Sequence, residues 1–248
     1  LKFLQEMSLK GILIYRPIDF VEKYLNRALI DYLDQQYFKK SIRPSPIFLL
    51  QLRLKRLFDI FFSFFILILS LPFCLIAIIL IKCEDNGPIF YSQIRNGLNN
   101  QTFKVYKFRS MKVNSEPNGP QWAKNKDNRI TKLGTILRKS RIDELPQLFN
   151  VIIGEMSLIG PRPERPEIDD MLEKKINLYT YRYSIKPGLS GWAQVNYPYG
   201  ASLEDSKNKL SFDFFYIKNY SFLLDVLILF KTIKTIVNLY GSVPYSYE

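Results

Sequence analysis

The sequence predicts an α+β protein that is mainly helical, with a re-entrant membrane segment of the helix-break-helix type, a small β-hairpin and amphipathic interfacial helices. Residues 60–81 are twenty-two residues without a charge, a length sufficient to cross a bilayer. Two β-rich runs follow at residues 89–95 and 102–109, joined by a loop that contains Asn96-Gly97, and this pattern is typical of a hairpin. The C-terminal segments carry aromatic and aliphatic residues on one side and lysines on the other at helical spacing.

Residues 1–46 are expected to be the remnant of an upstream domain with a linker, and residues 47–248 a membrane-associated domain. The chain starts at Leu1, and no signal-peptide pattern is present after it. We expect a strand at residues 11–15 and a helix at residues 19–32. So short a segment cannot bury an independent core, so it either belongs to an upstream domain or packs on the rest of the chain. Residues 41–46, with two prolines, are the expected linker.

Residues 57–82 are predicted to form the re-entrant helix. Pro72 lies just past the middle of the uncharged run, where it removes a backbone hydrogen bond and kinks a helix. Both flanks are basic, whereas a simple span has its basic flank on the cytoplasmic side. A helix that enters the cytoplasmic leaflet, breaks near residues 70–72 and returns explains both features, and the Ser70 hydroxyl is a partner for the broken backbone. A kinked helix that spans the bilayer is the alternative.

The remaining elements are predicted from local patterns. Lys107 and Arg109 end the second strand of the hairpin, and a polar loop then contains Trp122, expected to be a packing or interfacial anchor. The last two helices are amphipathic, and beside a membrane segment they either pack in the core or lie in the interface plane. Asp213 stands among aromatic residues and either pairs with Lys209 one turn back or points into a site. Helices are expected at residues 132–139, 144–153, 168–181, 203–218 and 222–240.

The charge of the chain is uneven. Its formal net charge is +12, and residues 95–141 hold twelve Lys or Arg residues against two acids. Such a block predicts an anionic partner, either a nucleotide diphosphate, acidic lipid headgroups or nucleic acid. No nucleic-acid-binding motif accompanies the block, so a nucleic-acid partner is not expected.

The chain contains no His, which excludes Ser-His-Asp and Cys-His arrangements and imidazole metal ligands. Its two cysteines, Cys74 and Cys83, lie in or beside the apolar run and cannot build a disulfide framework or a zinc site. They favour a reducing compartment. Catalysis must then fall to carboxylates, and any metal is expected to be oxygen-bound, with Mg²⁺ the first choice beside phosphate.

Asp143 and Glu144 are adjacent carboxylates at the expected start of a helix, because Pro146 fits only the first helical turn. A carboxylate beside several cations and a helix N-terminus describes a site that attracts phosphate and keeps Asp143 ionised. The alternative is that Asp143 only caps the helix. The cations near the pair in the sequence are Arg138, Lys139, Arg141 and Arg162.

Six short segments of the chain are distinctive and occur in order over most of its length. Together they resemble the bacterial sugar transferase family, the monotopic phosphoglycosyl transferases. Residues 19–22 and 197–202 look like the long exopolysaccharide-type members, which carry transmembrane helices and a Rossmann-like domain upstream. The six segments are Lys55-Arg56-Leu57-Phe58-Asp59, Gly87-Pro88-Ile89-Phe90, Lys107-Phe108-Arg109-Ser110-Met111, Asp143-Glu144-Leu145-Pro146-Gln147, Met156-Ser157-Leu158-Ile159-Gly160-Pro161-Arg162-Pro163 and Pro187-Gly188-Leu189-Ser190-Gly191-Trp192-Ala193-Gln194-Val195.

The resemblance implies transfer of a sugar-1-phosphate from a UDP-sugar to polyprenyl (undecaprenyl) phosphate, at the cytoplasmic face of the bacterial inner membrane. Mg²⁺ is the implied cofactor, with Mn²⁺ as a substitute. Asp143 is the implied nucleophile, which holds the phosphosugar covalently after UMP leaves, and Glu144, with Asp143, is the implied metal ligand. The residues implied to bind substrate and its phosphates are Lys107, Arg109, Arg138, Gln147, Arg162, Arg182 and Asp213.

Two other functions remain open from the sequence. One is a non-catalytic membrane scaffold for polysaccharide assembly, whose basic face holds anionic lipids. The other is a transferase that works by single displacement, without a covalent intermediate. The sequence names neither the sugar nor the oligomeric state, and a homodimer stays open.

Overall fold

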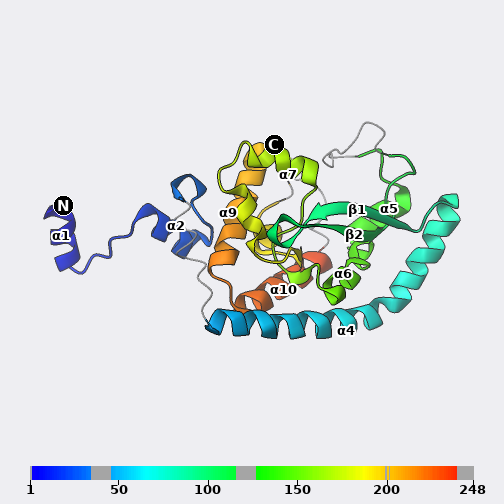
Figure 1. Ribbon diagram of the computed structural model, residues 1–248, viewed down its shortest axis with the longest axis horizontal. Helices are drawn as coiled ribbons and strands as arrows, with labels where there is room; N and C mark the ends of the chain where they lie inside the picture. Colours follow the sequence, from blue (N-terminus) through cyan, green and yellow to red (C-terminus); the bar gives the residue numbers. More distant parts are fainter. Residues whose placement is uncertain (1, 35–45, 116–126, 199, 201, 239–248) are drawn as a thin grey trace.

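The computed structural model describes residues 2–34, 46–115, 127–198, 200 and 202–238. It is mainly helical, with one antiparallel and one parallel pair of strands among the described residues (Figure 1). The elements are, in order, α1 (Lys2–Leu9), α2 (Pro17–Leu25), the 3-10 helix η1 (Ile30–Tyr32), α4 (Pro46–Asp85), β1 (Phe90–Asn96), η2 (Leu98–Asn100), β2 (Thr102–Phe108), α5 (Lys132–Lys139), η3 (Ile142–Glu144), α6 (Gln147–Ile153), β3 (Ser157–Ile159), α7 (Pro166–Glu173), η4 (Tyr179–Ser184), β4 (Gly188–Ser190), α8 (Trp192–Asn196), α9 (Leu203–Lys218) and α10 (Phe222–Val237).

The long helix α4 lies along one side of the molecule, beneath α10 and α6, and curves toward the hairpin in its second half (Figure 1). The helix break predicted at residues 70–72 is wrong, because α4 continues through Pro72. A proline inside a helix removes one hydrogen bond and bends the chain without ending it where neighbouring groups compensate. The Ser70 hydroxyl does bond the backbone, since its Oγ donates to the carbonyl oxygen of Leu67 at 3.2 Å.

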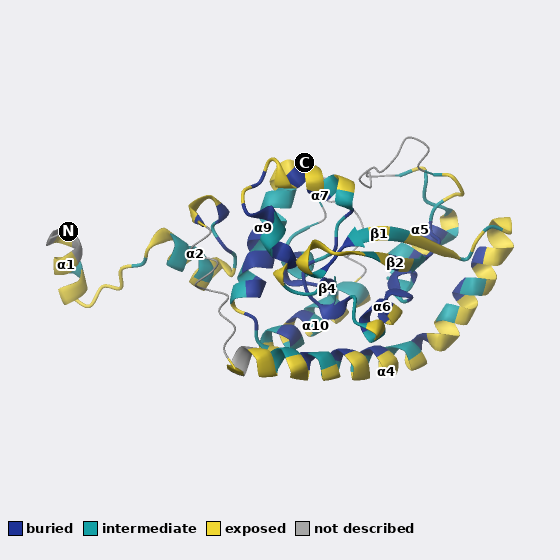
Figure 2. Ribbon diagram, viewed as in Figure 1, coloured by how far each residue is buried: buried dark blue, intermediate teal, exposed yellow. Residues whose placement is uncertain are grey.

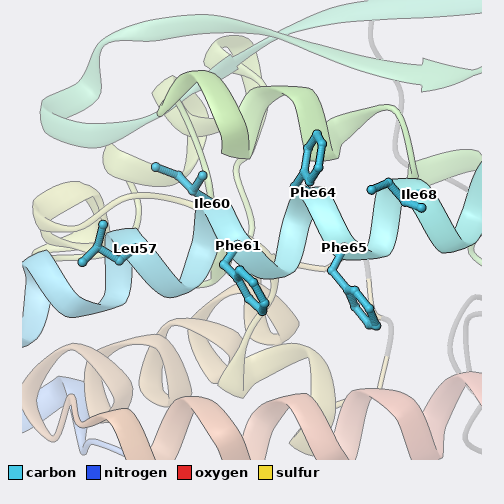
Figure 3. Close-up of a pocket in the computed structure, with 6 residues that line it drawn as sticks. All are labelled: Leu57, Ile60, Phe61, Phe64, Phe65 and Ile68. Atoms are coloured by element: carbon cyan, nitrogen blue, oxygen red, sulfur yellow. The ribbon is translucent and has the colours of Figure 1, made fainter.

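The outer surface of α4 is apolar and exposed. Within the described residues, one helix is long and apolar enough to cross a membrane, namely Leu49–Asp85, with a mean hydropathy of 3.1 in its most apolar window. Only 17% of that window is buried, whereas the core helix of a soluble protein is covered by neighbours. Six of its exposed or half-exposed side chains, from Leu57 to Ile68, lie together on this one helix (Figure 3). A surface of this kind indicates association with a membrane.

The predicted hairpin is confirmed. β1 and β2 pair antiparallel, with Phe90 opposite Phe108 and Asn96 opposite Thr102. The rings of Phe90 and Phe108 stack with centroids 5.4 Å apart on one face of the hairpin. In the connecting loop, Asn100 adopts a left-handed conformation with φ 62°, which asparagine tolerates better than most residues.

A parallel pair, β3 and β4, was not predicted. These strands have three residues each, and Ser157 pairs with Gly188 and Ile159 with Ser190. Runs this short carry no periodicity that separates strand from turn. The approach of the two backbones requires glycine, because a Cβ on Gly188 would lie 2.0 Å from the backbone nitrogen of Gly160.

The main core lies between the parallel pair, α6, α9 and α10 (Figure 2). Leu148, Val151, Met156, Phe214 and Ile228 are fully buried in it. Local caps fix the helices that surround the core. Side-chain oxygens accept hydrogen bonds from the first-turn N–H groups of three helices; these side chains are Thr131 before α5, Ser202 before α9 and Ser221 before α10.

Part of the N-terminal segment packs on the rest of the chain. Ala28, Ile30 and Leu33 are buried in the main core, and the Lys218 ammonium contacts Glu22 of α2 at 2.5 Å. The strand predicted at residues 11–15 is wrong, since Gly11 lies in a turn and residues 12–15 belong to no strand. The helix predicted at residues 19–32 is the shorter α2, followed by η1.

The helix predicted at residues 168–181 is shorter than expected. It ends at Glu173, because Leu178 takes a left-handed φ of 63° that a continuous helix excludes, and η4 follows. The helices predicted at residues 132–139 and 203–218 match α5 and α9. Residues 41–45 of the predicted linker and Trp122 lie outside the described residues.

Candidate active site

Asp143 and Glu144 lie in η3, between α5 and α6, and both side chains are buried. Arg141, just before η3, has a left-handed φ of 59°, a conformation that is rare for a residue with a side chain and is often found at functional sites. Neither carboxylate caps α6, whose N-cap position is Pro146 and has no side-chain hydrogen bond. The alternative in which Asp143 serves only as the cap of this helix is therefore wrong.

Three cations bind Glu144. Its Oε1 contacts the Lys107 ammonium at 3.2 Å and the Arg162 guanidinium at 2.5 Å, and its Oε2 contacts Arg141 at 3.1 Å. Burial would raise the pKa of Glu144, but the positive charges of these three residues outweigh it and hold the pKa well below its usual range. Glu144 is therefore a fixed negative charge that gathers cations from β2, the η3 turn and the loop after β3.

Asp143 has a different environment. Burial and the neighbouring charge of Glu144 raise the pKa of Asp143 to about 6, against the opposing effect of Lys107, Arg138 and Arg141. The cations therefore do not lower the pKa of Asp143 below its ordinary value, an effect of burial that sequence spacing does not show. A carboxyl with this pKa is still mostly ionised at pH 7. Within the described part of the chain, no group donates a hydrogen bond to its carboxylate.

Arg138 and Arg162, like Arg141, lie beside the pair and are partly exposed. The Nε of Arg138 donates to the Ser110 hydroxyl at 2.9 Å, which holds its guanidinium near Asp143. The Arg162 side chain is 38% exposed. A guanidinium with exposed N–H groups can bind the oxygens of an incoming phosphate in bidentate fashion.

Arg182 and Asp213 are buried against each other. The Arg182 guanidinium contacts the Asp213 carboxylate at 2.8 Å and donates to the carbonyl oxygen of Arg162 at 2.9 Å. The ion pair of Asp213 is thus with Arg182, and not with Lys209 one turn back. The Lys209 ammonium donates to the carbonyl oxygen of Gly200. The buried pair fixes the backbone at Arg162, and through it the cation that contacts Glu144.

Arg109 and Gln147 are not paired with the carboxylates. Arg109 is buried at the end of β2, where its guanidinium pairs with Asp85 at the end of α4. The Gln147 side chain, at the start of α6, is buried, and its Nε2 finds no hydrogen-bond partner among the described residues. A buried donor of this kind is commonly satisfied by a bound group.

Sequence reasoning used Lys55 and Arg56 only as a basic flank of the apolar run and assigned no role to Asp59, although all three lie in one of the distinctive segments. The Lys55 ammonium contacts Asp225 of α10 at 2.7 Å, and Asp59 accepts from the backbone N–H of Leu158 at 3.1 Å. Arg56 donates to the last carbonyl oxygens of α6, those of Val151 and Ile152, at 2.5 and 2.6 Å. Arg56 therefore ties α4 to α6, the helix that follows the carboxylate pair, while Lys55 and Asp59 tie α4 to α10 and β3. The signal was the presence of four charges within residues 53–59, at the edge of the apolar run.

The donor set suits Mg²⁺ only with help from a substrate. Within the described residues, no group of three or more His, Cys, Asp or Glu side chains surrounds a common point. Mg²⁺ is commonly bound by one or two carboxylates together with substrate phosphates and water. Asp143 and Glu144 provide that number of carboxylates, and the exposed Arg162 is the cation best placed to move from Glu144 to a phosphate.

Comparison with known proteins places these residues in a family. Residues 50–239 match the family described as bacterial sugar transferase. The chain is 44% identical over 241 residues to the UDP-N-acetylgalactosamine-undecaprenyl-phosphate N-acetylgalactosaminephosphotransferase of Aeromonas hydrophila, which covers 97% of this chain and 56% of that protein. It is 38% identical to the UDP-glucose:undecaprenyl-phosphate glucose-1-phosphate transferase of Klebsiella pneumoniae, over 76% of this chain and 41% of that protein.

A shorter relative extends the comparison. The exopolysaccharide production protein PSS of Rhizobium leguminosarum bv. phaseoli is 38% identical over 74% of this chain and 95% of its own length. By contrast, the chain spans about half the length of the Aeromonas and Klebsiella relatives. The match to residues 50–239 begins within α4 and includes η3, α6 and the buried pair of Arg182 and Asp213. The chain belongs to the bacterial sugar transferase family.

Proposed function

We propose that the chain transfers a sugar-1-phosphate from a UDP-sugar to polyprenyl phosphate at the cytoplasmic face of the bacterial inner membrane, as the first membrane step of exopolysaccharide or related glycan synthesis. The names of the relatives support a sugar-nucleotide donor and an undecaprenyl phosphate acceptor. The apolar surface of α4 supports a lipid acceptor, because it brings the site next to a membrane.

The reaction proceeds by two displacements at one phosphorus atom. An oxygen of the Asp143 carboxylate attacks the phosphorus that bears the sugar, the bond from that phosphorus to the bridging oxygen breaks, and UMP leaves with that oxygen. An oxygen of polyprenyl phosphate then attacks the same phosphorus, and the bond to Asp143 breaks. The products are a polyprenyl diphosphosugar and the free carboxylate, so the balance needs no oxidant or reductant.

The contrast between the two carboxylates carries this proposal. Three cations bind Glu144, while Asp143 accepts no hydrogen bond from the described residues and has a pKa of about 6. A nucleophile needs a lone pair that is not held by a donor, and the charge that spreads over a phosphate needs cations close by. Asp143 fits the first requirement, and Lys107, Arg138 and Arg162 fit the second.

The test is release of UMP by purified protein given a panel of UDP-sugars, with and without polyprenyl phosphate. With the acceptor we expect continuous release. Without it we expect a burst of at most about one UMP per site, because the aspartyl phosphosugar has no acceptor. Absence of UMP release with every donor would favour the non-catalytic scaffold, and turnover with acceptor but no burst would favour single displacement.

Glu144 and Asp143 would hold Mg²⁺, together with oxygens of the donor diphosphate. The ion, when bound, supplies charge neutralisation to the diphosphate. We expect Mg²⁺ or Mn²⁺ to support UMP release and excess EDTA to abolish it, since only oxygen donors surround the site. Full activity in EDTA would remove the metal from the mechanism. UMP release with Cd²⁺ or Zn²⁺ at the same concentration is the control that shows whether the site prefers Mg²⁺ and Mn²⁺.

The proposed topology is re-entrant, with both ends of α4 at the cytoplasmic face. The basic residues at both flanks and the curvature of the second half of α4, the half that contains Pro72, support it. In a chain with Cys74 and Cys83 replaced by Ser, Arg53→Cys and Glu84→Cys should react with a membrane-impermeant thiol reagent from the same side. Labelling from opposite sides would show that α4 spans the bilayer. Pro72→Leu should favour such a span. The residues after α4 would then lie on the side of the membrane opposite to the cytoplasm.

A further inference from the structure

A second cavity lies between the second half of α4 and the catalytic part of the chain. Its volume is about 450 Å³, in the range of pockets that hold small ligands. Its wall is made by α4, by the aromatic face of the hairpin, and by residues 145–149. The lining side chains are apolar and include Leu71, Leu75, Phe90, Tyr106, Pro146 and Phe149.

The cavity adjoins the carboxylate pair. Leu145 and Pro146, which line it, directly follow Asp143 and Glu144 in the chain. On β2, Tyr106 lines the cavity while the next residue, Lys107, contacts Glu144, as expected for neighbours that point to opposite faces of a strand. Residues 143–146 and the end of β2 therefore have cations and carboxylates on one side and apolar side chains on the other.

Several walls of the cavity are open. Phe149 is 58% exposed, Phe90 52% and Leu75 52%, so large apolar side chains from three elements face the same uncovered space. α4 forms one wall, and its remaining surface is the apolar face assigned to the membrane. A ligand can therefore enter from the bilayer, and its apolar chain would exchange contacts with lipid tails for contacts with the cavity wall.

We propose that this cavity holds the first isoprene units of the acceptor, next to the phosphate that reacts at Asp143. The inference rests on the proposed function. The acceptor has an anionic head and an apolar chain, and the structure offers cations and an apolar cavity on either side of residues 143–146. An acyl chain of a bilayer lipid would find the whole outer face of α4 equally apolar, whereas one wall of the cavity is the segment that directly follows Asp143 and Glu144.

The first test fills the cavity. Leu75→Trp and Phe149→Trp should each raise KM for polyprenyl phosphate by roughly tenfold, because the larger ring takes the volume that the isoprene chain needs. Leu69→Trp is the matched control, since Leu69 is on the same helix, is 58% exposed and does not line the cavity. The burst of UMP without acceptor should be unchanged in all three. An unchanged KM in both cavity variants overturns the assignment.

The second test uses the native chain. A short isoprenyl phosphate with a diazirine on its first units should label peptides that contain Leu75 or Phe149, and unlabelled isoprenyl phosphate should compete. Equal competition by a diacyl phospholipid would overturn the proposal and assign the cavity to bilayer lipid. Failure of the proposed function itself would give a different result: the native chain would release no burst of UMP with any donor.

Discussion

The variant Asp143→Asn is expected to lose turnover by roughly four orders of magnitude, while it folds and associates with membranes like the native chain. An amide has nearly the shape of a carboxylate but cannot attack phosphorus as an anion. Its fold should not suffer, because no described residue donates a hydrogen bond to Asp143. Burial disfavours the charge at this position, so the free energy of unfolding at pH 7 should stay equal or rise.

The measurement is UMP release at matched concentrations of folded protein, together with intact mass. Native protein given UDP-sugar and Mg²⁺ without acceptor should gain the mass of a phosphosugar on the peptide that contains Asp143. Asp143→Asn should not. Asp170→Asn is a control, since Asp170 is a carboxylate outside the site on α7. Near-normal turnover in Asp143→Asn would remove the nucleophile from the mechanism.

Asp213→Ala is expected to destabilise the fold by about 3–5 kcal/mol, because it leaves the Arg182 guanidinium buried without its carboxylate. The expected loss is a large part of the stability of an ordinary domain, about 5–15 kcal/mol. Burial raises the pKa of Asp213 to about 6 in spite of Arg182, which indicates how strongly this site disfavours an isolated charge. The Arg162 backbone should also lose its support, so KM for the donor should rise.

Thermal or denaturant unfolding in detergent measures the loss. Asp19→Ala is the matched control, because Asp19 pairs with Arg16 in an exposed contact and exposed pairs contribute little. A second variant, Asp213→Leu combined with Arg182→Met, removes both charges and should recover much of the stability. If Asp213→Ala unfolds like the control, the buried pair has no such role.

Local signals in the sequence were sufficient for several elements. α5 and α9 match their predicted bounds because Thr131 and Ser202 are caps that act within one turn. The hairpin followed from β-rich runs around a short loop. The parallel pair of β3 and β4 was missed because its partners lie far apart in the chain and each strand has only three residues.

The site was predicted in part. The sequence identified the adjacent carboxylates and their surplus of cations, but it did not show which cation binds which carboxylate. Lys107 and Arg162 meet at Glu144 only after β2 and the loop beyond β3 have folded against η3. The pKa of Asp143 depends on burial, and the partner of Asp213 on the position of η4. Such properties arise from tertiary contacts that spacing along the chain does not encode.

The contacts of Lys55, Arg56 and Asp59 join α4 to α10, α6 and β3. Arg56 holds the last carbonyls of α6, and α6 begins three residues after Glu144. In the proposed function, the depth of α4 in the lipid therefore sets the height of the carboxylate pair above the membrane surface. A water-soluble nucleotide and a lipid-borne phosphate would then meet at that height.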